Sequence, residues 1–309
     1  MLKERAVSIA QRIPAETRAK VRRTLVVTWF TSAVVMAAGA LFLTLLGKEF
    51  GQRVAAHGPW LALALAVPLS FMAEYVDSSL GMGYGTTLTP MLLLLGFPAK
   101  VVVPAVLVQE LASGALNAAA HHALGNADMR LRGKALRLAL LLGLCGVVGG
   151  AVAASVALRL PDKTVKLVTG LIVLSMGLLV LLSGRLRGTL SWWRAGSLGL
   201  VAAANKGFMG GGYGPIVTAG QVVAGVAPRE AVAVTSLSEV FTCAGGLLGY
   251  FAGGQALHWP LVVGLLAGGA AAAVFGAATV RALDPNRLRL GMVVGCFYLG
   301  LLTILKALR

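Results

Sequence analysis

The chain has 309 residues, of which 58% are hydrophobic and 12% are charged, and its formal net charge is +16. A soluble globular domain has about 45–50% apolar and about 25% charged residues, so this composition excludes an ordinary soluble enzyme, a disordered protein and a secreted disulfide scaffold. A membrane-spanning helix needs about 20 apolar residues, and the length accommodates about ten such helices. We therefore expect an all-α polytopic membrane protein whose main partner is the lipid bilayer.

The positive charge is divided among short clusters of Lys and Arg between apolar runs, which is typical of membrane topology rather than of nucleic-acid binding. Cys145, Cys243 and Cys296 lie inside apolar runs, without the spacing of a disulfide framework or a zinc site. The sequence also lacks a nucleophile–base constellation, a phosphate loop and a dinucleotide fingerprint. We expect no enzyme activity, no cofactor, no metal and no nucleic-acid partner.

The predicted elements begin with a basic tail over residues 1–23, followed by an extra apolar helix and loop over 24–57. A small-residue cleavage site does not follow this helix, so we interpret it as retained rather than as a signal peptide. Two Gly-rich pieces, 81–96 and 210–225, interrupt the remaining apolar runs. Those runs predict helices over residues 60–80, 100–122, 135–158, 164–183, 195–209, 230–252, 260–281 and 288–307.

Each Gly-rich piece is short for a helical span, and two arrangements are open. If 81–85 is extended and 86–96 is helical, the piece reaches roughly 33 Å and just crosses a hydrocarbon core of about 30 Å. The alternative is a re-entrant hairpin that returns to its own side. Crossing, with a cytoplasmic N-terminus, places most Lys and Arg in the cytoplasm, including the 130–137 cluster. We therefore expect crossing segments, a bacterial-type cytoplasmic membrane and a cytoplasmic loop over 125–134.

The chain contains an internal repeat, with a constant offset that places position 81 on position 210. Residues 81–85 (Gly-Met-Gly-Tyr-Gly) align with 210–214 (Gly-Gly-Gly-Tyr-Gly), and further matches follow without a gap. We place the first repeat at 58–184 and the second at 195–309, with about five crossings in each. An odd number of crossings inverts the second repeat relative to the first, which is common in secondary transporters. The aligned pairs include Thr89 with Thr218 and Glu110 with Glu239.

The two Gly-rich segments resemble the signature segments of the sulfite exporter TauE/SafE family, also called the toluene sulfonate uptake permeases. They read Leu80-Gly-Met-Gly-Tyr-Gly-Thr-Thr-Leu-Thr-Pro and Gly210-Gly-Gly-Tyr-Gly-Pro-Ile, the second continuing to Gly225-Val-Ala-Pro-Arg-Glu-Ala-Val. The resemblance covers about residues 58–305 and implies a bacterial-type permease for sulfite, thiosulfate, sulfonates or related small organic anions. The first segment departs from the pattern, because Asp77-Ser78-Ser79 precede the glycines and Met82 interrupts them.

The Gly-rich breaks are the first candidates for the substrate site. A helix that starts after a break presents unpaired N–H groups and the positive end of its dipole, which favours an anion. Nearby Thr hydroxyl groups add hydrogen-bond donors, and close helix packing through small residues is the alternative role of the glycines. Thr87 adds a further hydroxyl group nearby. The candidate substrate-binding residues are Gly83, Tyr84, Gly85, Thr86, Thr89, Gly212, Tyr213, Gly214 and Thr218.

Ionisable groups inside apolar runs are functional candidates by default, and they include Glu74, Asp77, Glu110, Lys206 and Glu239. A carboxyl group in a low-dielectric interior tends to stay protonated, so Glu110 and Glu239 are candidates for proton coupling. Their alternative role is that of interhelical hydrogen-bonding groups. We expect Glu239 to matter more, because Lys206 and the cleaner motif lie in its repeat.

Asp77 and Lys206 are aligned with each other by the same repeat offset. The two could form an ion pair at the repeat interface, or Lys206 could face the cavity as a counter-charge for the anion. Both alternatives keep Lys206 away from lipid, and we include it among the substrate-binding candidates.

The sequence thus predicts a secondary-active transporter of a small inorganic or organic sulfur-containing anion, with proton coupling. The alternative is an anion channel on the same inverted-repeat fold. A homodimer is left open, as are the substrate and the direction of transport.

Overall fold

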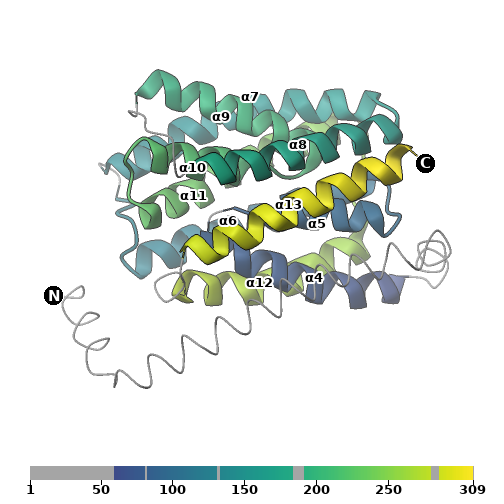
Figure 1. Cartoon of the computed structure of the whole chain (residues 1–309), viewed down its shortest axis with the longest axis horizontal. Helices are drawn as coiled ribbons and strands as arrows, with labels where there is room; N and C mark the ends of the chain where they lie inside the picture. The colour runs from purple at the N-terminus through teal and green to yellow at the C-terminus, as the bar shows by residue number, and fades with distance from the viewer. Residues whose placement is uncertain (1–58, 81, 131–132, 184–190, 280–284, 309) are drawn as a thin grey trace.

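The computed structural model describes residues 59–80, 82–130, 133–183, 191–279 and 285–308, so the predicted tail 1–23 and extra helix 24–57 lie outside the described residues. The described part is all-helical, with ten helices that lie alongside one another in Figure 1. In chain order they are α4 (Pro59–Leu80), α5 (Tyr84–Leu94), α6 (Ala99–Ala123), α7 (Lys134–Arg159), α8 (Asp162–Ser183), α9 (Trp192–Met209), α10 (Tyr213–Val223), α11 (Pro228–Ala252), α12 (Trp259–Thr279) and α13 (Pro285–Leu308).

Each predicted apolar run corresponds to one long helix, and each Gly-rich piece contains a short helix of 11 residues. The short helices begin at Tyr84 and Tyr213, whereas the first was expected to begin at Thr86. The difference arises because the backbone break is concentrated at the preceding glycines. Gly83 has φ 135° and Gly212 has φ 82°, a region that glycine adopts readily, and helical geometry resumes directly after them.

Four helices of the described part are long and apolar enough to cross a membrane: Ala99–Ala123, Lys134–Arg159, Asp162–Leu182 and Pro228–Ala252. Shorter apolar stretches occur at Trp259–Ala273 and Val293–Leu308. On α7, Leu144, Val148 and Val152 follow an i, i+4, i+8 spacing, and all three are at least 60% exposed. Such an outward apolar stripe suits contact with lipid rather than with water. The chain is a multi-pass membrane protein by these features.

The helix pattern repeats at the offset found in the sequence. Tyr84 and Tyr213 start α5 and α10, and Ala123 and Ala252 end α6 and α11. The glycines with positive φ obey the same offset, in the pairs 83 and 212, 96 and 225, and 125 and 254. The two halves of the described chain therefore bend at equivalent positions.

The packing partners also correspond between the halves. α4 packs on α12 and α9 packs on α7, while α6 packs on α11 and α8 packs on α13. The last two pairs join equivalent helices of the two halves. In the first of them, Gly114 lies against Ser236 and Leu107 lies against Gly246, so α6 and α11 are antiparallel.

The pair α8 and α13 has the same antiparallel arrangement. Gly170 of α8 lies against Gly300, and Gly177, two turns later, lies against Cys296. Because the residue numbers rise on one helix as they fall on the other, the two helices run in opposite directions.

The first Gly-rich piece leads back along the bundle. Glu74 of α4 contacts Asn117 of α6, and one turn further along both helices Ser78 contacts His121. α4 and α6 therefore run in the same direction, and the chain from the end of α4 must return to the opposite end before α6 begins. α5 covers the second part of this return.

Candidate transport site

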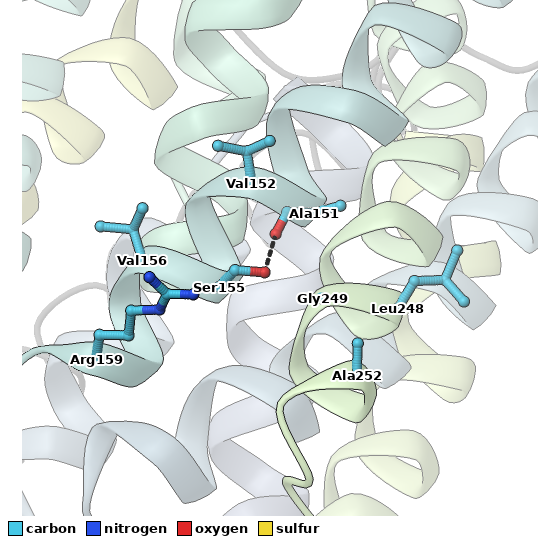
Figure 2. Close-up of a pocket in the computed structure, with 8 residues that line it drawn as sticks. All are labelled: Ala151, Val152, Ser155, Val156, Arg159, Leu248, Gly249 and Ala252. Carbon is cyan, nitrogen blue, oxygen red and sulfur yellow. Dashed lines mark hydrogen bonds between the residues drawn. The ribbon is translucent and has the colours of Figure 1, made fainter.

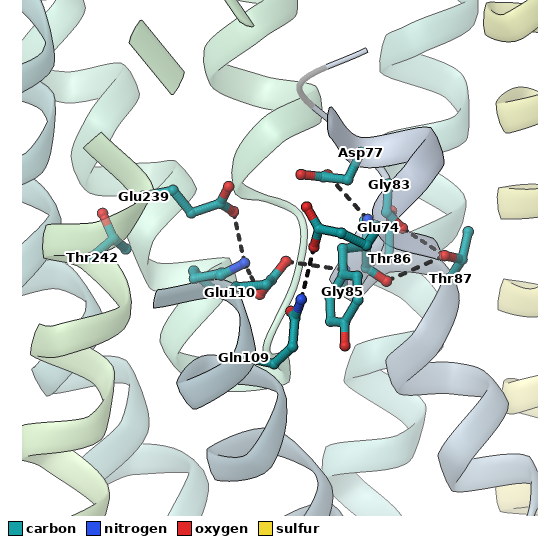
Figure 3. A network of polar contacts seen from close by, with 12 residues as sticks. Glu74, Asp77, Gly83, Gly85, Thr86, Thr87, Gln109, Glu110, Glu239 and Thr242 are labelled. Carbon is teal, nitrogen blue, oxygen red and sulfur yellow. Dashed lines mark hydrogen bonds and ion pairs between the residues drawn. The ribbon is translucent and has the colours of Figure 1, made fainter. Parts of the chain in front are cut away.

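The centre of the bundle holds one ammonium group between two carboxylates. Lys206 of α9 donates from Nζ to Glu239 Oε1 at 2.7 Å and also to Glu110 Oε2. Figure 3 shows the two glutamates turned towards each other. The antiparallel packing of α6 and α11 brings the midpoints of the two helices to the same level, and each glutamate lies near its midpoint. The exposed fractions are 0% for Lys206, 3% for Glu110 and 5% for Glu239. We call these three residues the central triad.

The N-terminus of α5 is occupied by carboxylates of the protein itself. The amide of Gly85 donates to Glu110 Oε1 at 3.2 Å (Figure 3). The amide of Tyr84 donates to Asp77 Oδ1 at 3.1 Å. The first amide groups of a helix favour an anion, and here internal carboxylates take that position. Glu110 therefore bonds to both the triad lysine and the break before α5.

The two Gly-rich breaks contact each other through their backbones. A Cβ atom on Gly85 would collide with the carbonyl group of Gly210, and one on Gly211 would collide with Gly85. The hydroxyl group of Thr89 lies beside Gly210, and it is buried without a hydrogen-bond partner in the described chain. In this conformation Gly85 therefore has the alternative role considered for the glycines, which is close packing.

The polar side chains around the first break are bound within the protein. Thr86 and Thr87 donate their hydroxyl groups to the carbonyl oxygen of Gly83, at 3.1 and 2.6 Å. The hydroxyl groups of Tyr84 and Ser70 are 2.8 Å apart. These contacts fix the start of α5, so Thr86 and Tyr84 do not present free donors at the break here.

The second break has a different environment. Gly212, Tyr213 and Gly214 are buried, and Thr218 donates to Thr235 Oγ1 at 2.8 Å. The repeat equivalent of Asp77 is Lys206, which donates rather than accepts hydrogen bonds. The first amide groups of α10 therefore lack the carboxylate partners that those of α5 have among the described residues.

Among the described residues, Asp77 and Lys206 do not form the ion pair that was one of the two alternatives predicted from the sequence. The ion pairs of Lys206 are with Glu110 and Glu239, and the Asp77 carboxylate instead accepts from the Tyr84 amide. The repeat offset indicates equivalent positions and does not by itself bring equivalent residues into contact. The two glutamates meet because α6 packs on α11.

Glu74 is a buried acid for which the sequence indicated no specific role. It accepts hydrogen bonds from Gln109, Asn117 and Ser78 and has an exposed fraction of 0%. Asn117 lies two turns after Glu110 on α6, and it contacts Glu74. The spacing of Glu74 and Ser78 on one helical face was the available signal.

A groove on the outer surface shares no residue with the triad. It lies between α7 and α11 and combines apolar side chains with Arg159 at one end (Figure 2). Val152 and Leu248 in its lining are about 60% exposed. The groove therefore opens to the surroundings of the bundle and not to the buried charges.

Comparison with known proteins adds independent information. The family model described as Sulfite exporter TauE/SafE matches residues 66–303. A curated relative, the "Probable membrane transporter protein YtnM" of Bacillus subtilis (strain 168), is 27% identical over 241 residues, which cover 74% of this chain and 77% of the relative. No solved structure matches the chain significantly. Because the family model spans most of the ten described helices, including both Gly-rich breaks and the central triad, this chain belongs to the sulfite exporter TauE/SafE family.

Proposed function

We propose that this protein is a secondary-active transporter that moves a small sulfur-containing anion across a bacterial-type cytoplasmic membrane and couples this movement to protons. Membership of the family and the relative's name as a probable membrane transporter support transport as the general function. The observation that carries the specific proposal is the central triad, in which a buried ammonium group is bound by two carboxylates beside two broken helices.

The inverted repeat is part of this proposal. A two-fold axis in the membrane plane makes equivalent helices antiparallel where they meet, whereas an axis along the membrane normal makes them parallel. The antiparallel pairs α6–α11 and α8–α13 support the first arrangement. Transporters built in this way bind substrate near the midplane, at the breaks of discontinuous helices.

Positive charge supports the proposed orientation. The α6–α7 loop and the flanking turn of α7 contain Arg130, Arg132, Lys134 and Arg137. The positive-inside rule assigns this end of the bundle to the cytoplasm. α7 leads away from this end and α8 leads back to it, so the end of α8 belongs to the same side, and the repeat places the end of α10 there as well.

The triad suggests how an anion and a proton exchange partners. In the empty carrier, Lys206 is neutralised by Glu110 and Glu239. An anion that binds Lys206 displaces a carboxylate, and a buried carboxylate without its cation is strongly disfavoured, so it takes up a proton. The anion and the proton then cross together as a load with less net charge, which lowers the electrostatic cost in the membrane.

Glu239 is better suited than Glu110 to release Lys206. Glu110 is also held by the amide of Gly85. Glu239 lies on α11, which packs on α10, and the first amide groups of α10 lack carboxylate partners among the described residues. We place the anion between Lys206 and the start of α10, where Gly212 and Gly214 allow close approach to the backbone. Departure of Glu239 opens this position without breaking the bond between Glu110 and Gly85.

An anion channel on the same fold is the competing function. The central triad is at most 5% exposed, and this closure favours a carrier over an open pore. The deciding experiment is counterflow in proteoliposomes with labelled sulfite, thiosulfate, sulfoacetate and sulfolactate, and with a dicarboxylate as the non-sulfur comparison. Saturable counterflow, together with accumulation that a protonophore abolishes, supports the proposal. Non-saturating flux that is insensitive to a protonophore would establish the channel instead.

A further inference from the structure

Glu74 lies in a second buried polar cluster outside the central triad. Its Oε2 atom accepts from Gln109 Nε2 at 2.8 Å, and its Oε1 atom accepts from Asn117 Nδ2 at 2.8 Å and from Ser78 Oγ at 3.0 Å (Figure 3 shows Glu74 with Gln109). All three partners are neutral, and none of the ion pairs formed by the described residues includes Glu74. An ionised carboxylate at this position would therefore be buried without a cation.

The ionisable groups around Glu74 do not supply that cation. Lys206 is already shared by Glu110 and Glu239, Lys306 of α13 donates to the carbonyl oxygen of Leu94, and α12 contains no ionisable residue over its described length. A buried charge needs a partner of opposite sign, and without one the group takes its neutral form. The other ionisable neighbours are Asp77 on α4, Tyr84 on α5, Glu110 and His121 on α6, and Glu239 on α11. His121 turns its ring nitrogens to the carbonyl oxygen of Ser78 and to the side chain of Asn126, and none of the ion pairs of the described residues joins it to Glu74.

The two amide side chains can serve both charge states of Glu74. Gln109 Oε1 and Asn117 Oδ1 are buried and have no hydrogen-bond partner in the described chain. An amide group donates from nitrogen and accepts at oxygen, and a half-turn about its last bond exchanges the two atoms. As placed, both amides donate to a carboxylate. After one of them turns, its oxygen can accept the O–H group of a protonated Glu74.

This cluster occurs in one half of the molecule. At the repeat offset, Glu74, Gln109 and Asn117 correspond to Ala203, Ser238 and Gly246. The cluster therefore cannot be explained as a copy of a duplicated structural element. Its position next to Asp77 and Ser78, at the end of α4 that leads into the first break, links it to the segment that must move during transport.

We propose that Glu74 is a second proton-binding site, distinct from the central triad, which takes one proton from the aqueous phase and releases it once in each transport cycle. Gln109 and Asn117 are positioning residues. Their amide nitrogens donate to the ionised carboxylate of Glu74, and the oxygen of one turned amide accepts the O–H group of the protonated acid. The part of this inference that concerns the cycle rests on the proposed proton-coupled function. The protonation of Glu74 itself does not depend on that function.

Infrared difference spectroscopy of the full chain in liposomes tests the site directly, through the C=O stretch of protonated carboxylic acids during a pH titration. Glu74→Gln keeps the size of the side chain and should remove one titrating band from the wild-type spectrum. Thr303→Val, which removes a buried hydroxyl group on α13, is the matched control and should keep the band. A Glu74→Gln spectrum with the full wild-type signal at every pH would overturn the proposal.

Two further measurements sharpen the assignment. Asn117→Leu removes a donor to the carboxylate, so the band of Glu74 should persist to higher pH than in the wild type; an unchanged titration would overturn the role of the amide. Replacement of choline by Na⁺ at constant pH should leave the band unchanged. If Na⁺ diminishes it, the cluster binds a metal cation and the proton assignment fails. Glu74→Asp keeps a carboxyl group at this position, so its band should be displaced rather than absent. This result would show that the band is missing from Glu74→Gln because the carboxyl group is gone and not because the variant is misfolded.

Proton counting separates this proposal from the proposed function. In proteoliposomes with thiosulfate as the probe, or with whichever anion of the counterflow panel is transported, Glu74→Gln should move one proton fewer per anion. If the wild type moves the anion without any proton, the proposed coupling fails while the infrared band still decides the state of Glu74. If the wild type is coupled and Glu74→Gln has the same stoichiometry, the role of Glu74 in the cycle is overturned.

Discussion

Glu110 and Glu239 occupy equivalent positions of the internal repeat and bind the same ammonium group, that of Lys206, from two antiparallel helices. Their environments differ in one respect, because Glu110 also accepts the amide of Gly85. The two glutamates thus have equivalent positions in the repeat but different hydrogen-bond partners. This asymmetry gives the two glutamates different expected roles.

The first prediction concerns these roles. Glu239→Gln mimics the protonated acid, so it should retain anion binding and exchange but lose accumulation driven by a pH gradient. Glu110→Gln should show the same defect more weakly, because Glu239 remains as the carboxylate that can exchange its proton. Uptake under an imposed pH difference, compared with counterflow of the same anion, measures both properties. Undiminished accumulation by Glu239→Gln would show that the residue has only a structural role.

The second prediction concerns Lys206. Lys206→Met leaves two buried carboxyl groups without a cation, and removal of one partner from a buried ion pair typically costs about 3–5 kcal/mol. We expect a lower thermal unfolding temperature at neutral pH and a partial recovery at acidic pH, because protonation removes the uncompensated charges. Lys206→Met combined with Glu239→Gln should be more stable than Lys206→Met alone. Equal destabilisation at all pH values would contradict the ion-pair explanation.

The third prediction concerns the contact between the two breaks. Gly85→Ala should reduce transport and stability, because its Cβ atom would collide with the backbone at Gly210. Gly295→Ala in α13 is the matched control, since no heavy atom lies within 4 Å of its Cβ position and its φ is not positive. Transport rates and thermal unfolding of the two variants should differ clearly. Wild-type behaviour of Gly85→Ala would show that the breaks need not touch.

The fourth prediction concerns topology. In a cysteine-free background, Asp128→Cys in the α6–α7 loop should react with an impermeant maleimide only after the cells are permeabilised. Asp128 is exposed, so a cysteine at this position is accessible to the reagent. Ala256→Cys, in the α11–α12 loop at the other end of the bundle, should react in intact cells. Labelling of Asp128→Cys in intact cells would overturn the proposed orientation.

Much of the fold follows from local sequence. The apolar runs predicted the long helices because a membrane helix must satisfy its own backbone groups and expose apolar side chains. The glycines predicted the breaks because Gly83 and Gly212 can adopt positive φ at little cost. The first residue of α5 was less predictable. It depends on which of the consecutive glycines leaves helical geometry, and in the structure Gly83 has the positive φ that directly precedes α5.

The sequence by itself determined which residues are available for transport: the acids within apolar runs, Lys206, the two breaks and their repeat. Only the tertiary structure decided how they combine. Lys206 pairs with Glu110 and Glu239 rather than with Asp77, and Glu74 has its own neutral partners. These choices depend on the relative level and rotation of helices far apart in the chain, which residue spacing within one helix does not specify. The antiparallel contact of α6 with α11 places the two glutamates at the same depth in the bundle. Both pair with the ammonium group of Lys206 there, because a charge that is excluded from water needs a partner of opposite sign.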